Sequence, residues 1–198
     1  MRALTEDETA RVVNAALSES ADALQALRAD ATALAAIARA AALIVDAFAR
    51  GGRVFSCGNG GSMCDAMHLA EELSGRFRGN RKGLPAQAIS DAGYLSCVAN
   101  DFGYDAVFRR QIEALGRKGD VAVGISTSGR SPSVVTALAR AREMGLVTVG
   151  MTGNGGGALA GQVDYLIDVP SPATPRIQEV HALVIHVLCA IVEEAIAG

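Results

Sequence analysis

The sequence lacks an uninterrupted apolar run long enough to cross a membrane, although 50% of its 198 residues are hydrophobic. A membrane helix needs about 18 or more apolar residues with few charges. The most apolar stretches, 33–49 and 182–197, are interrupted by charges or too short. Residues 1–10 carry four charged groups and no apolar core, so they do not resemble a secretory signal. We therefore predict a soluble, cytoplasmic protein with no membrane partner.

An excess of positive charge is also missing, because the net charge is −3. General nucleic-acid binding depends on Lys and Arg neutralising phosphates, so we predict no nucleic-acid partner. Arg76, Arg78, Arg81 and Lys82 form a local basic cluster. We favour a solvated loop over a nucleic-acid patch, and an anionic small molecule is a third use for the cluster.

Closely spaced cysteine pairs are absent. The 4 cysteines, Cys57, Cys64, Cys97 and Cys189, form no Cys-x-x-Cys motif, which argues against a zinc knuckle or a thiol redox motif. We expect them to be reduced, buried and to behave as small apolar residues.

The chain is long enough for one well-buried domain. Residues 6–50 are rich in Ala, Leu and Arg without Pro or Gly, which predicts two helices split near 29–32 and ended by Gly51 and Gly52. From residue 53 onward, short apolar runs alternate with helical segments. The predicted strands are 53–57, 85–90, 121–126, 146–152 and 165–169. The predicted helices are 62–77, 92–98, 104–115, 131–144, a short one near 158, and 175–196.

This alternation predicts an α/β fold with a parallel sheet that helices cover on both faces. We expect a flavodoxin-like three-layer αβα sandwich with five parallel strands. Ligands of such folds bind beyond the carboxyl ends of the strands.

The most informative segment follows the first predicted strand. It contains a first glycine loop, residues 58–62, and then a predicted helix with His68 and Glu72 four residues apart. Residues at that spacing share one helix face, so they could form an acid/base or metal-binding pair. The loop is not a dinucleotide fingerprint, because Met63 occupies the position of the third glycine. A tight turn without a ligand and an anion-binding loop remain open alternatives.

A hydroxyl loop, residues 126–131, follows the third predicted strand. A simple helix cap would explain Ser131, but not Ser126, Thr127 and Ser128 as well. Hydroxyls, backbone N–H groups and the helix dipole would together bind a phosphate here. We therefore favour phosphate binding.

Two further segments carry weaker signals. The second glycine loop, residues 153–157, formally matches a dinucleotide pattern, but the rest of that motif's context is missing, so we predict a turn. His186 lies among apolar residues of the last predicted helix, which makes a partly buried core histidine its simplest interpretation.

Taken in order, these motifs resemble the sugar isomerase (SIS) domain family and, within it, the bacterial phosphoheptose isomerases. The resemblance spans nearly the whole chain. The matching motifs are CGNGGS (57–62), MHLAEEL (67–73), AISD (88–91), ANDFGY (99–104), GISTSGRS (124–131), MTGNGGG (151–157), VPS (169–171) and RIQEVHALVIH (176–186).

The resemblance implies a homotetramer that interconverts D-sedoheptulose 7-phosphate and D-glycero-D-manno-heptose 7-phosphate, the first step of nucleotide-activated heptose biosynthesis. It implies one SIS domain over residues 1–198, with the helical extension 1–50 in the oligomer interface. Glu72 and His186 would be the catalytic acid/base pair. The implied substrate-binding residues are Asn59, Gly60, Gly61, Glu72, Asn100, Asp101, Ser126, Thr127, Ser128, Ser131 and Gln178.

Some members of the family bind zinc, and the matching residues here are His68, Glu72, Gln178 and His186. The resemblance thus implies one Zn²⁺ per subunit. Along a regular helix Gln178 and His186 would be about 12 Å apart. Both could bind one ion only if Gln178 stands at an irregular helix start or has a long reach.

Two other functions stay open at this point. A non-catalytic SIS protein could associate with the DnaA initiator or sense sugar phosphates, and an isomerase could act on another phosphosugar. The presence of Glu72 and His186 favours an enzyme over the non-catalytic protein. The motifs as a set resemble the heptose enzymes more than isomerases of another phosphosugar.

Overall fold

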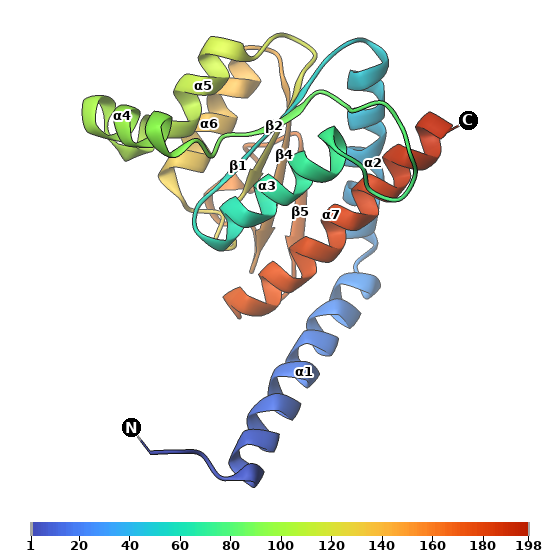
Figure 1. Cartoon of the computed structure of the whole chain (residues 1–198), viewed down its shortest axis with the longest axis vertical. Helices are drawn as coiled ribbons and strands as arrows, with labels where there is room; N and C mark the ends of the chain where they lie inside the picture. The colour runs from blue at the N-terminus through green and yellow to red at the C-terminus, as the bar shows by residue number, and fades with distance from the viewer. Residues whose placement is uncertain (1, 198) are drawn as a thin grey trace.

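The computed structural model describes residues 2–197, which form a sheet between two layers of helices, with one helix extending away from them (Figure 1). The strands are β1 (Val54–Gly58), β2 (Ala86–Ala88), β3 (Val121–Ile125), β4 (Val147–Gly153) and β5 (Tyr165–Val169). The helices are α1 (Glu6–Ala29), α2 (Ala31–Ala49), α3 (Gly61–Ser74), α4 (Ala92–Phe102), α5 (Val107–Leu115), α6 (Pro132–Glu143) and α7 (Thr174–Ala197). Two short 3₁₀ turns, η1 (Tyr104–Ala106) and η2 (Gly157–Leu159), complete the described elements.

All five strands are parallel and follow the order β2-β1-β3-β4-β5. Alternation along β3 explains the two apolar layers. Val121 and Val123 belong to the cluster shared with α2, α3 and α7, whereas Ala122 belongs to the cluster shared with α4, α5 and α6. The predicted three-layer αβα sandwich with five parallel strands is confirmed.

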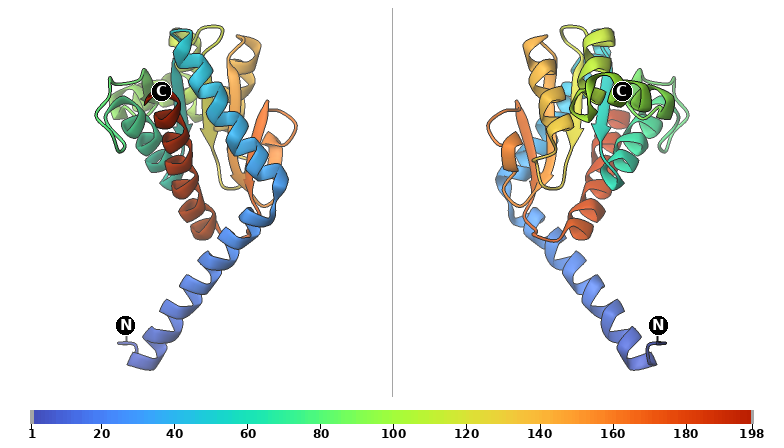
Figure 2. Two further views of the ribbon diagram at one scale, coloured as in Figure 1. Left: turned by 90° about the vertical axis from the view of Figure 1, so that its right-hand side faces the viewer. Right: turned by 90° about the vertical axis from the view of Figure 1, so that its left-hand side faces the viewer.

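The split between the first two helices falls at Asp30, within the predicted 29–32. Asp30 ends α1, and its carboxylate caps α2 by accepting from the N–H groups of Thr32 and Ala33. A capping box between Thr5 and Glu8 starts α1. Figure 2 shows that most of α1 projects beyond the sandwich.

By length and composition alone, α2 could cross a membrane, which the sequence did not lead us to expect. In the fold, α2 lies against β5 and α7 and buries one stripe, which includes Ile37, Ala41 and Ile44. These contacts are those of a core helix of the sandwich.

Several predicted boundaries were wrong. The helix predicted to reach Phe77 ends at Ser74, because Gly75 follows with a backbone that leaves the helical region. The strand predicted over 85–90 shrinks to the three residues of β2, which lies at the edge of the sheet and pairs only with β1. The burial predicted for the cysteines is also wrong for Cys64 and Cys97, which are exposed.

Candidate active site

The first glycine loop and the hydroxyl loop meet at the carboxyl end of the sheet. Gly58 and Ile125, the last residues of β1 and β3, are partners in the parallel register, so the loops that follow start side by side. The Asn59 amide Nδ2 donates to Ser133 Oγ across 3.0 Å and so joins the first loop to α6. The location agrees with the rule that parallel α/β sheets bind ligands beyond their strand ends.

Glycine is required in the first loop by close packing. A Cβ on Gly58 would lie 2.5 Å from the Ser62 carbonyl oxygen. A Cβ on Gly61 would collide with the side-chain amide of Gln178. The structure thus brings Gln178 of α7 to the loop of Asn59, Gly60 and Gly61, which are also predicted substrate-binding residues.

Ser131 does not use its hydroxyl to cap α6, contrary to the simplest interpretation of that residue. Ser131 Oγ instead lies 3.1 Å from the hydroxyl of the buried Ser126. The Arg130 N–H donates to Ser128 Oγ at 3.2 Å. The loop therefore gathers hydroxyls at the start of α6, where the helix dipole favours an anion.

Backbone hydrogen bonds join the second glycine loop and the adjoining η2 to the hydroxyl loop. Gly153 N–H donates to the Thr127 carbonyl at 3.0 Å, and Leu159 N–H donates to the Gly129 carbonyl at 3.1 Å. A Cβ on Gly157 would collide with the Ser128 carbonyl oxygen. The predicted turn is confirmed, because residues 154–157 all have positive φ.

His68, Glu72 and His186 converge from two helices that neighbour each other on one face of the sheet. His68 Nε2 lies 3.4 Å from Glu72 Oε1 on α3 and 3.1 Å from His186 Nε2 on α7. The two imidazole rings meet edge to face, with Phe77 beside His186. All three side chains are half-buried. A hydrogen bond between the two rings requires one Nε2 to donate and the other to accept.

The same three donor atoms suit a metal ion. They lie within 4.8 Å of one another. A tetrahedral zinc ion about 2.0–2.1 Å from each donor holds its ligand atoms about 3.3 Å apart. The separations of His68 from Glu72 and from His186 match that value, while Glu72 and His186 lie within 4.8 Å of each other. The donor types fit zinc, and its binding would require Glu72 and His186 to move closer together.

Gln178 and His186 are eight residues apart on α7. Because α7 begins at Thr174, Gln178 does not stand at an irregular helix start. Its amide lies at the first glycine loop, against Gly61. Its role as a fourth metal ligand stays a prediction.

Asn100 and Asp101 lie near the end of α4, where both are exposed. Asn100 Nδ2 donates to Asp101 Oδ1 at 2.9 Å, and within residues 2–197 no hydrogen bond joins either residue to another candidate side chain. Tyr104, which follows α4, connects the end of this helix to the site, because its hydroxyl donates to Asn59 Oδ1 at 2.8 Å.

Three residues near the site were not singled out as functional by their sequence motifs. Tyr104 fixes the Asn59 amide, and Arg81 contacts the end of α3. Asp65 stands one turn before His68, and one of its carboxylate oxygens is buried and has no hydrogen-bond partner among residues 2–197. Burial raises the pKa of Asp65 to about 6, against the opposing effect of His68. In the sequence, the one sign of a role for Asp65 is that it lies three residues before His68.

With this geometry established, comparison with known proteins defines the class. Residues 17–153 match the SIS domain. The matched residues include the first glycine loop and the hydroxyl loop, and the chain is therefore an SIS domain protein.

Individual relatives identify the family within this class. The phosphoheptose isomerase of Salmonella paratyphi B is 54% identical over 179 residues, which cover 90% of this chain and 93% of the relative. The structure of a phosphoheptose isomerase from Neisseria gonorrhoeae is 39% identical with a TM-score of 0.87, over 94% of this chain and 99% of that chain. A phosphoheptose isomerase from Francisella tularensis is 33% identical with a TM-score of 0.88, over 94% and 98%. The chain belongs to the phosphoheptose isomerase family of SIS domain proteins.

Proposed function

We propose that this protein is a phosphoheptose isomerase that interconverts D-sedoheptulose 7-phosphate and D-glycero-D-manno-heptose 7-phosphate. The observation that carries the proposal is the convergence of His68, Glu72 and His186, in a chain 54% identical to a phosphoheptose isomerase. The reaction would open the synthesis of nucleotide-activated heptose. We further propose that residues 1–198 act as one SIS domain in the cytoplasm.

An aldose–ketose isomerisation moves a proton between adjacent carbons through an enediol. In our proposal Glu72 is the base that removes the proton from one carbon and returns it to the next. His186 exchanges a proton with the sugar oxygens, so that the carbonyl and hydroxyl change places. Another well-known isomerase likewise uses a carboxylate as the base and a histidine that acts on the carbonyl oxygen.

The substrate would lie between the loops at the strand ends. We assign its phosphate to Ser126, Thr127, Ser128 and Ser131, and its sugar to the first glycine loop and Gln178. The gathered hydroxyls and the start of α6 support this assignment. Asn100 and Asp101 complete the proposed substrate-binding set.

We also propose one Zn²⁺ per subunit, held by His68, Glu72 and His186 and, as the fourth ligand, Gln178. The types of the first three donors, and the separations of His68 from Glu72 and from His186, support zinc. When bound, the ion would polarise the sugar oxygens and stabilise the negative charge of the enediolate. Metal analysis and the loss of turnover on chelation, restored by added zinc, test this assignment.

Turnover of sedoheptulose 7-phosphate by the purified protein tests the reaction. Glu72→Gln and His186→Gln should each lower kcat by at least about 100-fold, within the range that acid/base groups contribute. Circular dichroism should show both variants folded. Near wild-type turnover in either variant would contradict its role. Wild-type protein without isomerase activity that is captured by the DnaA initiator would favour the non-catalytic alternative.

A homotetramer is our proposal for the assembly. Its support is an apolar groove between α1, α2 and α7, lined by Leu24, Leu27, Leu34, Ile37, Leu183, Val184, Val187 and Ile191 among others. Several of these side chains are about 40% exposed, as expected for a face covered by another subunit.

A further inference from the structure

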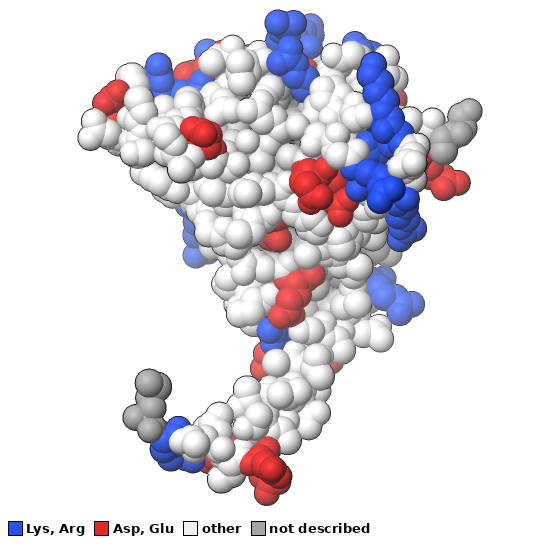
Figure 3. All heavy atoms as spheres, viewed as in Figure 1, with Lys and Arg blue, Asp and Glu red and all other residues white. Residues whose placement is uncertain are grey.

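Arg81 is the member of the basic cluster that is not solvated. Figure 3 shows basic and acidic side chains together near the loop that follows α3. Within that loop the Arg81 side chain is only 10% exposed, which contradicts the solvated loop predicted for it. Arg76, Arg78 and Lys82 are exposed, as predicted. An arginine buried on a loop calls for partners that satisfy its charge.

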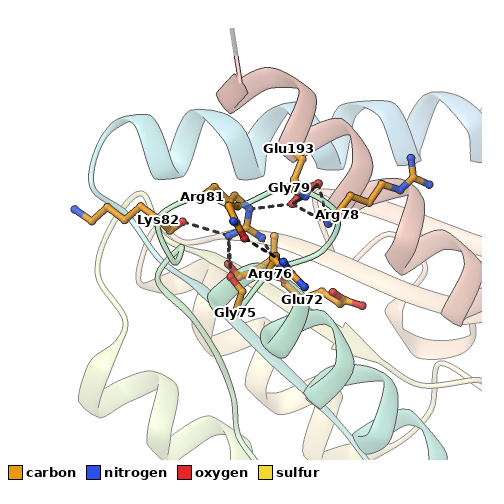
Figure 4. Close-up of polar contacts among 10 residues, drawn as sticks. Glu72, Gly75, Arg76, Arg78, Gly79, Arg81, Lys82 and Glu193 are labelled. Carbon is orange, nitrogen blue, oxygen red and sulfur yellow. Dashed lines mark hydrogen bonds and ion pairs between the residues drawn. The ribbon is translucent and has the colours of Figure 1, made fainter.

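The guanidinium of Arg81 caps the carboxyl end of α3 (Figure 4). Nη2 donates to the Glu72 carbonyl at 2.6 Å, and Nη1 donates to the Leu73 carbonyl at 2.8 Å. Nη1 also lies 3.4 Å from the Gly75 carbonyl oxygen and 3.3 Å from that of Lys82. The last carbonyls of a helix lack partners within the helix, and a cation there also interacts favourably with the dipole. Arg81 thus bonds the backbone of the proposed catalytic base itself.

The other edge of the guanidinium faces α7. Arg81 Nε lies 3.3 Å from Glu193 Oε1 as an ion pair, without the alignment of a hydrogen bond. The Glu193 side chain is 14% exposed, and its carboxylate also accepts from the N–H groups of Arg78 and Gly79. Glu193 stands seven residues, or two turns, after His186, on the same side of α7.

One side chain therefore ties together the two helices that carry the site. His68 and Glu72 belong to α3, and His186 belongs to α7. The 3.1 Å separation between the two imidazoles depends on how these helices lie against each other. Removing the guanidinium would leave two helix carbonyls without their donor and a mostly buried carboxylate without its cation, which favours a rearrangement at this point.

We propose that Arg81 is a positioning residue of this isomerase, acting as a clamp that holds Glu72 of α3 in place against His186 of α7. The inference rests on the proposed function. It makes no use of Arg81 as a substrate ligand, because its donors face the backbone of α3 and Glu193. The clamp should affect the chemical step more than substrate binding, because the proposed phosphate site lies on the loop between β3 and α6.

The kinetic test compares Arg81→Met with Lys82→Met, which removes the same charge from the exposed neighbouring residue. Arg81→Met should lower kcat about tenfold and leave KM within about twofold, as expected for misplaced catalytic groups. Lys82→Met should match the wild type. Arg81→Lys should fall in between, because an ammonium keeps the charge but lacks the planar fork. Unchanged kcat in Arg81→Met would overturn the proposal.

Histidine NMR gives a second readout that does not depend on turnover. The chain has 3 histidines, so imidazole labelling gives few signals. In Arg81→Met, and more weakly in Glu193→Gln, the signals of His68 and His186 should move while that of buried His181 stays. If kcat per folded molecule stays constant and only the thermal stability falls, the role of Arg81 is merely structural.

Two outcomes separate the possible failures. If the wild type does not turn over the phosphosugar, the proposed function fails, and the histidine signals alone decide whether Arg81 positions the site. If Arg81→Met does not fold, Glu193→Gln decides, because it weakens the ion pair and keeps the carbonyl contacts. Unmoved signals of His68 and His186 in Glu193→Gln would then refute the clamp.

Discussion

His181 and His186 lie five residues apart on α7, yet their surroundings differ. His186 is half-buried and faces His68. His181 is fully buried, with Nε2 3.0 Å from the Thr152 carbonyl, and its Nδ1 has no hydrogen-bond partner in the described part of the chain. Because a carbonyl only accepts, neutral His181 carries its proton on Nε2. Burial lowers the pKa of His181 to about 4, against the opposing effects of Thr152 and Asp168.

The lowered pKa of His181 predicts a loss of stability in mild acid. An unfolded chain protonates this histidine below about pH 6.5, whereas the folded protein stays neutral there until about pH 4. Between these values the unfolded state binds more protons, so the contribution of His181 to the free energy of unfolding falls as the pH falls. The loss is on the order of 3 kcal/mol across that window.

Urea unfolding of the wild type and His181→Gln at pH 7 and pH 4.5 measures this contribution. Asp65 acts in the opposite direction, because its raised pKa favours the folded state as the pH falls toward its unfolded value. The comparison with His181→Gln cancels that effect. We expect the variant to lose less stability than the wild type on acidification, and an equal loss would show that His181 does not titrate as described.

At the scale of elements, contacts with the second glycine loop hold the hydroxyl loop in its conformation. Its backbone donates to the Thr127 carbonyl, while η2 donates to that of Gly129. The glycines of the two loops approach so closely that neither Gly129 nor Gly157 has room for a side chain. Glycine is needed here for close approach as well as for positive φ.

A pair of alanine substitutions separates these two requirements. Gly155 and Gly157 both have positive φ, but a Cβ on Gly155 meets no atom within 4 Å. Gly157→Ala should displace the hydroxyl loop and raise KM for the phosphosugar about tenfold, the loss of roughly one phosphate contact. Gly155→Ala should cost about 1 kcal/mol of stability from backbone strain and leave KM unchanged. Equal KM values in the two variants would argue against the supporting role.

At the scale of the whole molecule, α1 stands out because most of it leaves the sandwich (Figure 1). Only Ala23 and Leu27 of α1 are buried, whereas Val12, Val13 and Leu17 are more than half exposed. A long helix with so little burial gains its stability from another surface. This surface and the apolar groove suit the proposed association of subunits.

The groove offers a direct test of that association. Leu183 lies in it and is 43% exposed, while Leu115 at the end of α5 is 38% exposed on the other helical layer. Leu183→Asp should reduce the tetramer to smaller species in light scattering at micromolar concentration, because a buried carboxylate is costly. Leu115→Asp should leave the assembly intact. A wild-type monomer, or a tetramer with Leu183→Asp, would contradict the assigned interface.

The sequence by itself determined the layered fold and the separate pieces of the site. Strand-sized apolar runs between helices predict a parallel sheet, and the hydroxyls of residues 126–131 and the spacing of His68 and Glu72 are visible locally. Their type and spacing depend only on neighbours along the chain, which is why they could be predicted. The motifs also carried the family resemblance, which the relatives confirm.

Only the tertiary structure decided how those pieces combine. It brought His186 within 3.1 Å of His68, although 118 residues separate them, and buried His181 instead. It also placed Arg81, a member of the basic cluster, where it donates to the Glu72 carbonyl and forms an ion pair with Glu193. Such contacts depend on how α3 and α7 pack on the sheet, and no local pattern of residues encodes that packing.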